Sequence, residues 1–481
     1  MQQPVVDYSR KWYIMAAAAM SIFLATIDGS IVNVALPTLV RAFETDFATV
    51  QWVVLSYLLT QTTLLLSIGR LGDMIGKKAI FIIGMVIFTL SSALCGLSPT
   101  ISWLIAARVL QAVGAAMMLA LTTAIVTEAF PRAERGKALG LIGSSVSIGV
   151  VVGPTLGGLL IQSLSWHWIF FVNLPVGIVA VWMGMRYIPA FRPVGRQEFD
   201  YWGGVLLLIS LLCFLLALTL GQDMGFTSGL ILLLFAIWLV ALVGFITVEW
   251  RTKEPMIDLR LFRNQLFSIN LITGFLTFIS IAGVFILIPF YLENVLGYNT
   301  SQVGLMLAVV PVGLGIMAPI SGSLSDQFGA RPITVIGLAT LVIGYFAMST
   351  LSESTGVLGY VLRLLPIGLG MGIFQSPNNS IIMGSAPRER TGIVSSLLSI
   401  TRTLGQTSGI AIFGAIWAAQ VIAFLGSVPT GGATAAPIAA QVVGLQGTFR
   451  ISGVLVMLGL ALSIWGVIQE RRMVRVTAQT S

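Results

Sequence analysis

The stretch FLATIDGSIVNVALP, residues 23–37, belongs to a hydrophobic segment that indicates a membrane helix, and it places a carboxylate inside that segment. Apart from Asp28, the segment from Trp12 to Pro37 carries no charged residue and is long enough to cross a bilayer as a helix. An acid near the middle of a membrane helix costs about 2.5–3.5 kcal/mol on insertion scales. Asp28 therefore predicts either a buried partner of opposite charge or a use for the acid.

The composition of the whole chain agrees with a membrane protein of many spans. Of its 481 residues, 57% are hydrophobic and 9% are charged, and its mean hydropathy is +0.97. A soluble protein of this length needs far more polar surface. The net charge of +8 is spread over short segments between hydrophobic stretches, so it indicates membrane topology and not nucleic-acid binding. Cys95 and Cys213 lie inside hydrophobic stretches, where we expect buried thiols and no metal or disulfide chemistry.

Hydrophobic stretches of about 20 residues recur along the chain, and each is long enough to form a membrane-spanning helix. We expect fourteen spans, near residues 12–35, 47–68, 79–97, 101–125, 138–161, 167–187, 201–220, 228–249, 267–291, 301–322, 332–350, 356–380, 392–420 and 448–469. An even number of spans puts both ends of the chain on one side of the membrane. Most of the 26 Lys and Arg fall in loops on the side of the N-terminus, so both termini are predicted to be cytoplasmic.

The two halves of the chain repeat the same short motifs. GRLGDMIGKK at residues 69–78 matches GSLSDQFGAR at residues 322–331. Other pairs at nearly the same offset are Gly149 with Gly405, Gly153 with Gly409 and Arg108 with Arg363. Internal repeats of this kind are typical of transporters, although a purely structural duplication is the alternative.

The repeat divides the chain into three parts. We predict an N-terminal six-helix half at residues 1–190 and a C-terminal six-helix half with a short cytoplasmic tail at residues 266–481. Residues 191–265 are predicted to hold two inserted transmembrane helices and their cytoplasmic linkers. The expected fold class is therefore an all-α polytopic membrane protein.

Four motifs, in order along the chain, resemble those of the fourteen-span drug/proton antiporter branch of the major facilitator superfamily, of the EmrB/QacA type. They are LATIDGSIVNVALP (24–37), GRLGDMIGKK (69–78), RVLQAVGAAMM (108–118) and GVVVGPTLGG (149–158). The stretch WHWIFFVNLPVG (166–177) also resembles this branch. Met74 departs from the pattern, because a basic residue is usual there, which puts one loop contact in doubt. The resemblance implies the major facilitator fold.

The resemblance also implies roles for two groups of residues. The loop residues Gly69, Asp73, Gly76, Lys77 and Lys78 match a loop that latches the outward-open state. The antiporter-motif residues Gly149, Gly153, Pro154, Gly157 and Gly158 match a helix that bends between the halves and seals the transport path against leak. Glycines at i, i+4 spacing let another helix approach closely, and a proline removes one helical hydrogen bond. Ordinary close packing is the alternative for this helix.

Asp28 and Arg108 are expected at the same depth in the membrane. Each lies about seven residues from the outer end of its span, which is about 10 Å at the helical rise. Pairing would lower the free energy of burying each charge. We interpret Asp28 as the proton carrier and Arg108 as its partner in proton coupling. The alternative is a static ion pair or a hydrogen bond that locks two helices together, and the sequence leaves open whether Asp28 and Arg108 touch.

Five polar or aromatic side chains are candidates for lining a substrate cavity. They are Asn33, Tyr57, Gln61, Gln111 and Arg402. Asn33 is more readily explained by a bond to a neighbouring helix. Gln61 and Gln111 fit either lining or packing. Arg402 is expected about 15 Å deep, where it can bind backbone carbonyls or an acidic or phosphate-bearing substrate.

These observations favour a proton-coupled exporter of hydrophobic or amphipathic compounds, a multidrug efflux antiporter of the cytoplasmic (inner) membrane. The alternative is an exporter of a dedicated endogenous metabolite, lipid or siderophore on the same scaffold. A receptor has no need of Asp28, and an enzyme is not expected, since the single His167 has no catalytic or metal-ligand partners in the spans. We expect no cofactor or metal, with the proton gradient as energy source. Expected partners are a small substrate, protons, the lipid bilayer and, in some members of the branch, a periplasmic adaptor protein.

Overall fold

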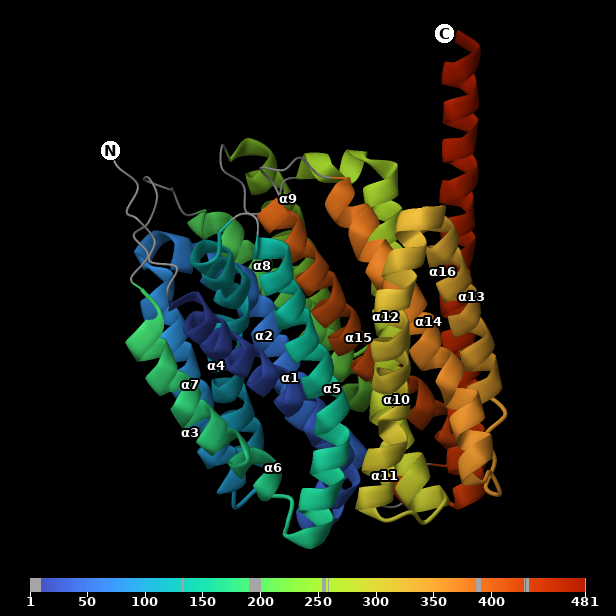
Figure 1. The fold of residues 1–481 in the computed structure, drawn as a ribbon. Helices are drawn as coiled ribbons and strands as arrows, with labels where there is room; N and C mark the ends of the chain where they lie inside the picture. The colour runs from blue at the N-terminus through green and yellow to red at the C-terminus, as the bar shows by residue number, and fades with distance from the viewer. Residues whose placement is uncertain are drawn as a thin grey trace. The chain divides into compact units, whose positions relative to one another are not determined.

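The fold was analysed in a computed structural model in which the described part of the chain is helical, with connecting turns (Figure 1). The structure describes residues 10–131, 134–189, 200–252, 257, 259–385, 391–427, 429 and 432–480. The chain forms two compact units, Met1–Leu212 with Asn299–Leu305, and Cys213–Tyr298 with Met306–Ser481. The predicted boundaries of the inserted segment, residues 191–265, stay a prediction.

The first unit is a bundle of helices packed around α1 and α4. Its helices are α1 (Lys11–Ala42), α2 (Phe47–Ile75), α3 (Lys77–Gly96), α4 (Ile101–Ala129), α5 (Arg135–Ser163), α6 (Trp168–Phe171) and α7 (Asn173–Tyr187). Two helices begin at side-chain caps, because Asp46 accepts a hydrogen bond from Thr49 N at 2.7 Å and Thr100 accepts one from Trp103 N at 3.3 Å. The core between α1, α3 and α4 is formed by small and hydrophobic side chains.

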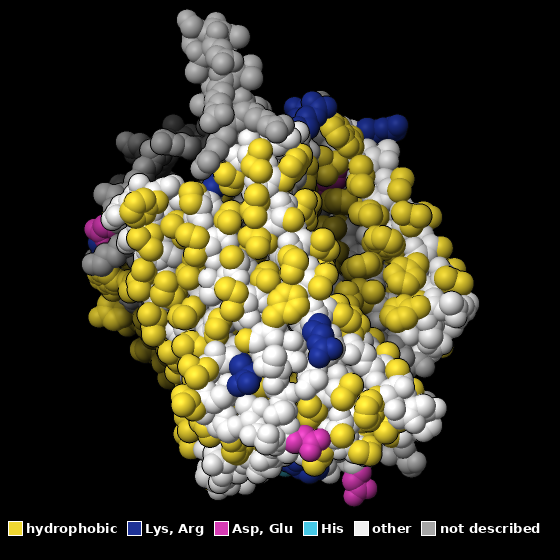
Figure 2. Space-filling view, turned by 90° about the vertical axis from the view of Figure 1, so that its right-hand side faces the viewer, with side chains coloured by type: hydrophobic (Ala, Val, Ile, Leu, Met, Phe, Trp, Pro, Cys, Tyr) yellow, Lys and Arg dark blue, Asp and Glu magenta, His cyan; other side chains and the backbone are white. Residues whose placement is uncertain are grey.

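The second unit is also helical. It contains α9 (Gly229–Arg251), η3 (Leu259–Arg263), α10 (Gln265–Phe290), η4 (Tyr291–Val295), α12 (Val309–Phe328), α13 (Ala330–Met348), α14 (Val357–Gly384), α15 (Thr391–Leu425), η6 (Ala433–Ala435) and α16 (Ile438–Thr480). The two units share α8 (Tyr201–Met224) and α11 (Thr300–Leu307). Figure 2 shows mainly hydrophobic side chains on the face formed by α13, α14 and α16. Large side chains that are more than half exposed there include Ile343, Leu358, Leu362 and Leu458, as expected of a surface that faces lipid.

Thirteen helices of the described residues are long and apolar enough to cross a membrane. The second predicted span, 47–68, corresponds to α2, which is not among the thirteen and carries several Gln, Ser and Thr residues. The fold class predicted from the sequence, an all-α polytopic membrane protein, is confirmed.

Two predicted spans are interrupted helices. The span at 167–187 is divided into α6 and α7, and the span at 301–322 into α11 and α12. The first interruption has a local cause. Pro175 lacks a backbone N–H and cannot donate the helical hydrogen bond to the carbonyl of Phe171, the last residue of α6, so the hydrogen bonding is broken between α6 and α7. Asn173 is thereby placed at a helix start in the interior of the unit.

The sequence repeat reappears as the same helix packing in each unit, considered separately. Gly114 of α4 packs against the backbone of Phe88 in α3, and Gly337 of α13 packs in the same way against Phe374 of α14. Gly76 and Gly329 join consecutive helices with φ angles of 111° and 86°. Residues other than glycine rarely adopt positive φ angles of this size, so the sharp turns explain why both positions are glycine.

Candidate functional site

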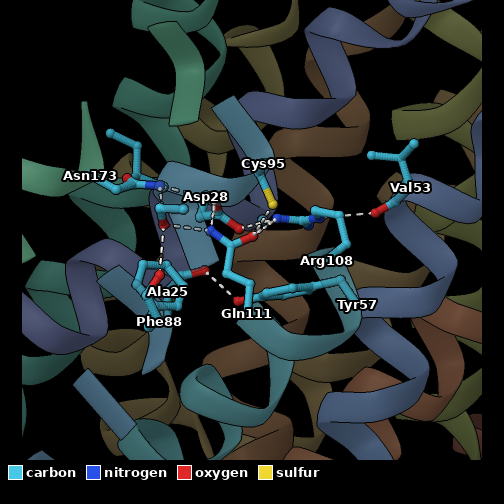
Figure 3. Close-up of polar contacts among 12 residues, drawn as sticks. Ala25, Asp28, Val53, Tyr57, Phe88, Cys95, Arg108, Gln111 and Asn173 are labelled. Carbon is cyan, nitrogen blue, oxygen red and sulfur yellow. Dashed lines mark hydrogen bonds and ion pairs between the residues drawn. The ribbon is translucent and has the colours of Figure 1, made fainter. Parts of the chain in front are cut away.

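Asp28 and Arg108 form an ion pair in the interior of the first unit. Arg108 Nη1 of α4 lies 2.5 Å from Asp28 Oδ2 of α1, and both residues have a relative exposure of 0% (Figure 3). The two helices bring these residues together although 80 positions separate them in the sequence. The shared depth predicted from the spans is thus accompanied by direct contact. Burying one of these charges without the other would be strongly unfavourable.

Two carboxamides complete the hydrogen bonding of the Asp28 carboxylate. Gln111 Nε2 donates to Asp28 Oδ1 at 2.9 Å, and Asn173 Nδ2 donates to the same oxygen at 3.0 Å (Figure 3). Gln111 and Asn173 have relative exposures of 0% and 1%. With Arg108, the carboxylate accepts from three donors that come from α4 and α7. This set suits an ionised acid held away from water.

Arg108 has further partners besides Asp28. Its Nε donates to the backbone carbonyl of Val53 at 3.0 Å, and its Nη1 also donates to Gln111 Oε1 at 2.6 Å. The Tyr57 ring lies 4.1 Å from Arg108 Cζ, a cation–π distance. The guanidinium is therefore solvated by neutral groups from α2 and α4 as well as by the carboxylate.

A second layer surrounds the two carboxamides. The hydroxyl of Ser92 in α3 accepts from Gln111 Nε2 at 2.8 Å and donates to the backbone carbonyl of Phe88 at 2.9 Å. The Cys95 thiol lies 3.7 Å from Gln111 Oε1. Cys95 and Cys213 are both free and buried, so the prediction of buried thiols is confirmed. In Cys95 the thiol contributes a weak donor to the network.

The antiporter-motif helix packs on the segment of α1 that carries Asp28. A Cβ atom at Gly149 would lie 3.0 Å from Thr26 Cβ, and one at Gly157 would lie 2.6 Å from Ile31 Cγ1. Ser30 Oγ donates to Gly149 O at 3.1 Å. Gly153 packs against Ser30 in the same way. Since Thr26, Ser30 and Ile31 flank Asp28 in sequence, the three glycines Gly149, Gly153 and Gly157, here called the glycine ladder, hold α5 against the helix that carries the acid.

The remaining motif residues, Pro154 and Gly158, contact the short segment Asn299–Leu305 that belongs to the first unit. A Cβ atom at Gly158 would lie 3.0 Å from Ser301 Cα, and Gly304 packs on the Pro154 carbonyl. The side chain of Gln162 accepts from Ser301 N at 3.2 Å. All five residues of this motif thus lie at close helix contacts.

The predicted latch loop forms the tight connection between α2 and α3. Gly76 ends α2 and donates from its backbone N–H to Gly72 O at 3.1 Å. Lys77 Nζ forms an ion pair with Glu128 of α4, and Lys78 Nζ donates to Met185 O at 3.2 Å. Gly69 lies in α2, and a Cβ atom at this position would lie 3.9 Å from Ala120 Cβ. The side chain of Asp73 lies outside the described residues.

The cavity-lining candidates have different surroundings. Asn33 Nδ2 donates to Gly29 O of its own helix at 3.3 Å, so it bonds its own helix and not a neighbouring one. Tyr57 and Gln111 are buried beside Arg108, whereas Gln61 is partly exposed in α2. Arg402 of α15 is partly buried, and its Cζ lies 5.9 Å from the centre of the Phe278 ring. Within the described part of the chain, Arg402 has no ion pair or hydrogen bond.

Sequence reasoning missed three members of the Asp28 network, Ser92, Asn173 and the Val53 carbonyl. Asn173 lies in the WHWIFFVNLPVG stretch, and its amide in an otherwise apolar run was a usable signal. Ser92 offers no such signal, because serines are common in membrane helices and often bond only to their own backbone. A backbone carbonyl leaves no trace in the sequence.

Comparison with known families identifies the class of protein. The sequence pattern of the Major Facilitator Superfamily matches residues 18–410. The chain belongs to the major facilitator superfamily and is a multi-pass membrane transporter, not an enzyme.

Several characterised relatives are similar over most of their length. The chain is 35% identical to the riboflavin transporter RibZ of Clostridioides difficile, over 85% of this chain and 89% of RibZ. It is 31% identical to the multidrug transporter protein MdtP of Bacillus subtilis, over 92% of this chain and 82% of MdtP. It is 34% identical to the multidrug resistance protein Stp of Mycobacterium tuberculosis, over 85% of this chain and 76% of Stp.

Solved structures share the fold at low sequence identity. A bacterial homologue of the human lysosomal transporter Spinster has a TM-score of 0.66 and 17% identity, over 95% of this chain and 96% of that chain. The nucleoside transporter NupG has a TM-score of 0.66 and 11% identity, over 94% of this chain and 99% of that chain. These similarities concern the fold alone.

Proposed function

We propose that the chain is a proton-coupled antiporter of the fourteen-span drug/proton branch, which exports small hydrophobic or amphipathic compounds by alternating access. The observation that carries this proposal is the fully buried Asp28–Arg108 ion pair. Ionisable groups in membrane helices are rare, and in transporters they mark proton relays.

The surroundings of Arg108 support a proton carrier over a static pair. When Asp28 takes a proton, Arg108 loses its counter-charge but keeps the Val53 carbonyl, Gln111 Oε1 and the Tyr57 ring. These neutral partners lower the free energy of the state in which the cation stands without an anion.

The glycine ladder supports coupling between the acid and helix movement. Because Gly149, Gly153 and Gly157 hold α5 against α1 on both sides of Asp28, a shift of α5 changes the packing of the segment that carries the acid. Protonation and conformation thereby influence each other. Coupling of this kind is what alternating access with a proton requires.

The relatives and Arg402 support the proposed substrate class. The similarity to multidrug transporters supports a substrate range of hydrophobic or amphipathic compounds. The similarity to the riboflavin transporter RibZ supports the second candidate function, in which the substrate is one dedicated metabolite. Arg402, a membrane-depth cation with no ion pair or hydrogen bond to any described residue, favours substrates that carry an acidic group.

The proposal places the protein in the cytoplasmic (inner) membrane, with lipid and protons as its constant partners. The proton gradient is the energy source, and no cofactor is required. An adaptor protein is proposed only where export must continue across a second envelope membrane.

The test is uptake into inside-out vesicles of three fluorescent probes, ethidium, a labelled lipid and an anionic dye. Wild type and Asp28→Asn are compared with and without an imposed proton gradient. We expect wild-type uptake of at least one probe that needs the gradient and falls to background in Asp28→Asn. Equal wild-type uptake without the gradient, or unchanged uptake in Asp28→Asn, would contradict the proposal.

A further inference from the structure

Two buried carboxamides donate to the same oxygen of Asp28, but they differ in what their own oxygens contact. Gln111 Oε1 accepts from Arg108 Nη1 at 2.6 Å and faces the Cys95 thiol at 3.7 Å. Asn173 Oδ1 is buried and has no hydrogen-bond partner among the described residues. Buried amide oxygens without a partner are uncommon and call for an explanation.

The orientation of the Gln111 amide is fixed from both ends. Turning it over would point its NH₂ group at the Arg108 guanidinium, which can only donate, and its oxygen at the ionised Asp28 carboxylate, which can only accept. Two hydrogen bonds would be replaced by two repulsive contacts. Gln111 therefore acts as a permanent donor to Asp28.

The orientation of the Asn173 amide is fixed from one end only. Its Nδ2 donates to Asp28 Oδ1 at 3.0 Å, with a longer contact of 3.5 Å to Ser92 Oγ. Turning the amide over breaks these two contacts of Nδ2. It breaks no hydrogen bond of Oδ1, because Oδ1 has no partner among the described residues. Asn173 is thus the carboxamide that can present either end to Asp28.

Protonation of Asp28 creates the need for such a group. A proton that forms an O–H bond on Oδ1 turns this acceptor into a donor, and all three present neighbours of the carboxylate are donors. A buried O–H without an acceptor is unfavourable.

We propose that Asn173 is a positioning residue that serves both charge states of Asp28, donating from Nδ2 to the carboxylate and accepting at Oδ1 from the protonated acid after a half-turn of its amide. This inference rests on the proposed role of Asp28 as proton carrier. It explains the orphaned Asn173 oxygen as the unused half of a two-position contact.

The other ionisable groups around Asp28 come from three helices. They are Arg108 of α4, Tyr57 of α2 and Cys95 of α3. The parts of α5 and α7 that pack on this segment of α1 present glycines and Asn173. Among the described residues facing Asp28, no second carboxylate competes for the proton.

The test is an infrared titration of the protonated Asp28 carboxyl in the purified full-length protein without substrate. The band is assigned by its loss in Asp28→Asn. The variant Asn173→Leu removes both the donor and the acceptor. When Asp28 is protonated in wild type, Asn173 Oδ1 gains a hydrogen bond, so we expect a downward shift of the Asn173 amide carbonyl band that accompanies the Asp28 carboxyl band and is missing in Asn173→Leu.

An Asn173 amide carbonyl band that does not change overturns the proposal. If Asn173 is only a fixed donor, or has a purely structural role, its oxygen has no partner in either charge state of Asp28, and no band lost in Asn173→Leu accompanies the carboxyl band. Asn173→Ala, which fits the same space, is measured in parallel and is expected to lose the same amide band, so a folding defect of the leucine variant does not decide the test.

Asn378 of α14 provides a matched control. It is also buried, with a relative exposure of 3%, and its Oδ1 likewise lacks a partner among the described residues. We expect Asn378→Leu to keep both the Asp28 carboxyl band and the accompanying amide band, and loss of that amide band in this control would overturn the proposal. Because no substrate is present, the two proposals fail differently. Transport that is unchanged in Asp28→Asn overturns the role of proton carrier, while an Asp28 band that appears without the accompanying Asn173 amide band overturns only the two-position role of Asn173. An Asp28 band absent at every pH removes both.

Discussion

The guanidinium of Arg108 contacts the carboxylate of Asp28 at 2.5 Å, between helices α4 and α1 and with both side chains fully buried. Neither side chain is exposed to solvent in this arrangement, so each charge is neutralised by the other. The pair therefore determines both the stability of the first unit and the free energy of protonating its acid.

Removal of one partner should be more harmful than removal of both. Arg108→Met leaves Asp28 buried and unpaired, and we expect a loss of about 3–5 kcal/mol in stability. The double variant Asp28→Leu/Arg108→Met should recover part of this loss, because no isolated charge remains. Thermal unfolding in detergent measures both. Strict additivity of the two single variants would contradict the coupling.

The glycine ladder of α5 should tolerate no side chain where it meets α1. A Cβ atom at Gly153 collides with Ser30 Oγ, so we expect Gly153→Ala to abolish or strongly reduce transport. Gly143 of the same helix is the control, because a Cβ atom there would meet no atom of the described residues within 4 Å. Gly143→Ala should retain transport and gain up to about 1 kcal/mol from helix propensity. Vesicle uptake that is equal in the two variants would argue against the ladder.

The ion pair between Lys77 and Glu128 connects the predicted latch loop to α4. Both side chains are partly exposed, at 15% and 35%, so the pair contributes only about 0–1 kcal/mol to stability. We expect Lys77→Glu to lower the transport rate several-fold by repulsion while stability changes little. The exchange Lys77→Glu/Glu128→Lys should restore most of the rate. A double variant as slow as the single one would show that the charge pair is not what matters.

Arg402 should discriminate between substrates by charge. If its guanidinium receives an acidic group, Arg402→Gln weakens binding of an anionic substrate about tenfold or more and leaves a neutral one unchanged. Arg363 is the matched control, since its guanidinium is occupied by Thr350 Oγ1 at 2.8 Å and Gly359 O at 2.9 Å. Equilibrium binding measures both variants. Equal losses for anionic and neutral compounds would assign Arg402 to packing.

The main parts of the fold could be predicted because they depend on properties that are local in sequence. Hydrophobic length predicts the spans, and the repeated GRLGDMIGKK-type loops predict two related halves. The shared depth of Asp28 and Arg108 also followed from the span boundaries and the opposite charges from the sequence, whereas their direct contact stayed open until the structure showed it. Gly149 and Gly153 predicted a close helix contact by their spacing alone.

The detailed network could not be predicted, because it depends on how each helix is rotated about its axis. Ser92 and Asn173 face Asp28 only in the folded bundle, and Gln111 fitted cavity lining as well as packing. The interruption before Asn173 was also missed. Pro175 lies two residues later, but Pro37 and Pro154 lie inside continuous helices, so a proline alone does not indicate a break. The mean hydropathy of the stretch 167–187 stays high across the break, so it does not reveal where α6 ends and α7 begins.

The central claim is that Asp28 carries the proton that drives export. The most direct measurement is proton release from purified protein in weakly buffered detergent solution when an exported probe is added. The account predicts release from wild type and none from Asp28→Asn, because the variant has no acid to deprotonate at this site. Release from Asp28→Asn equal to that of wild type would contradict the claim and leave the Asp28–Arg108 pair a structural contact.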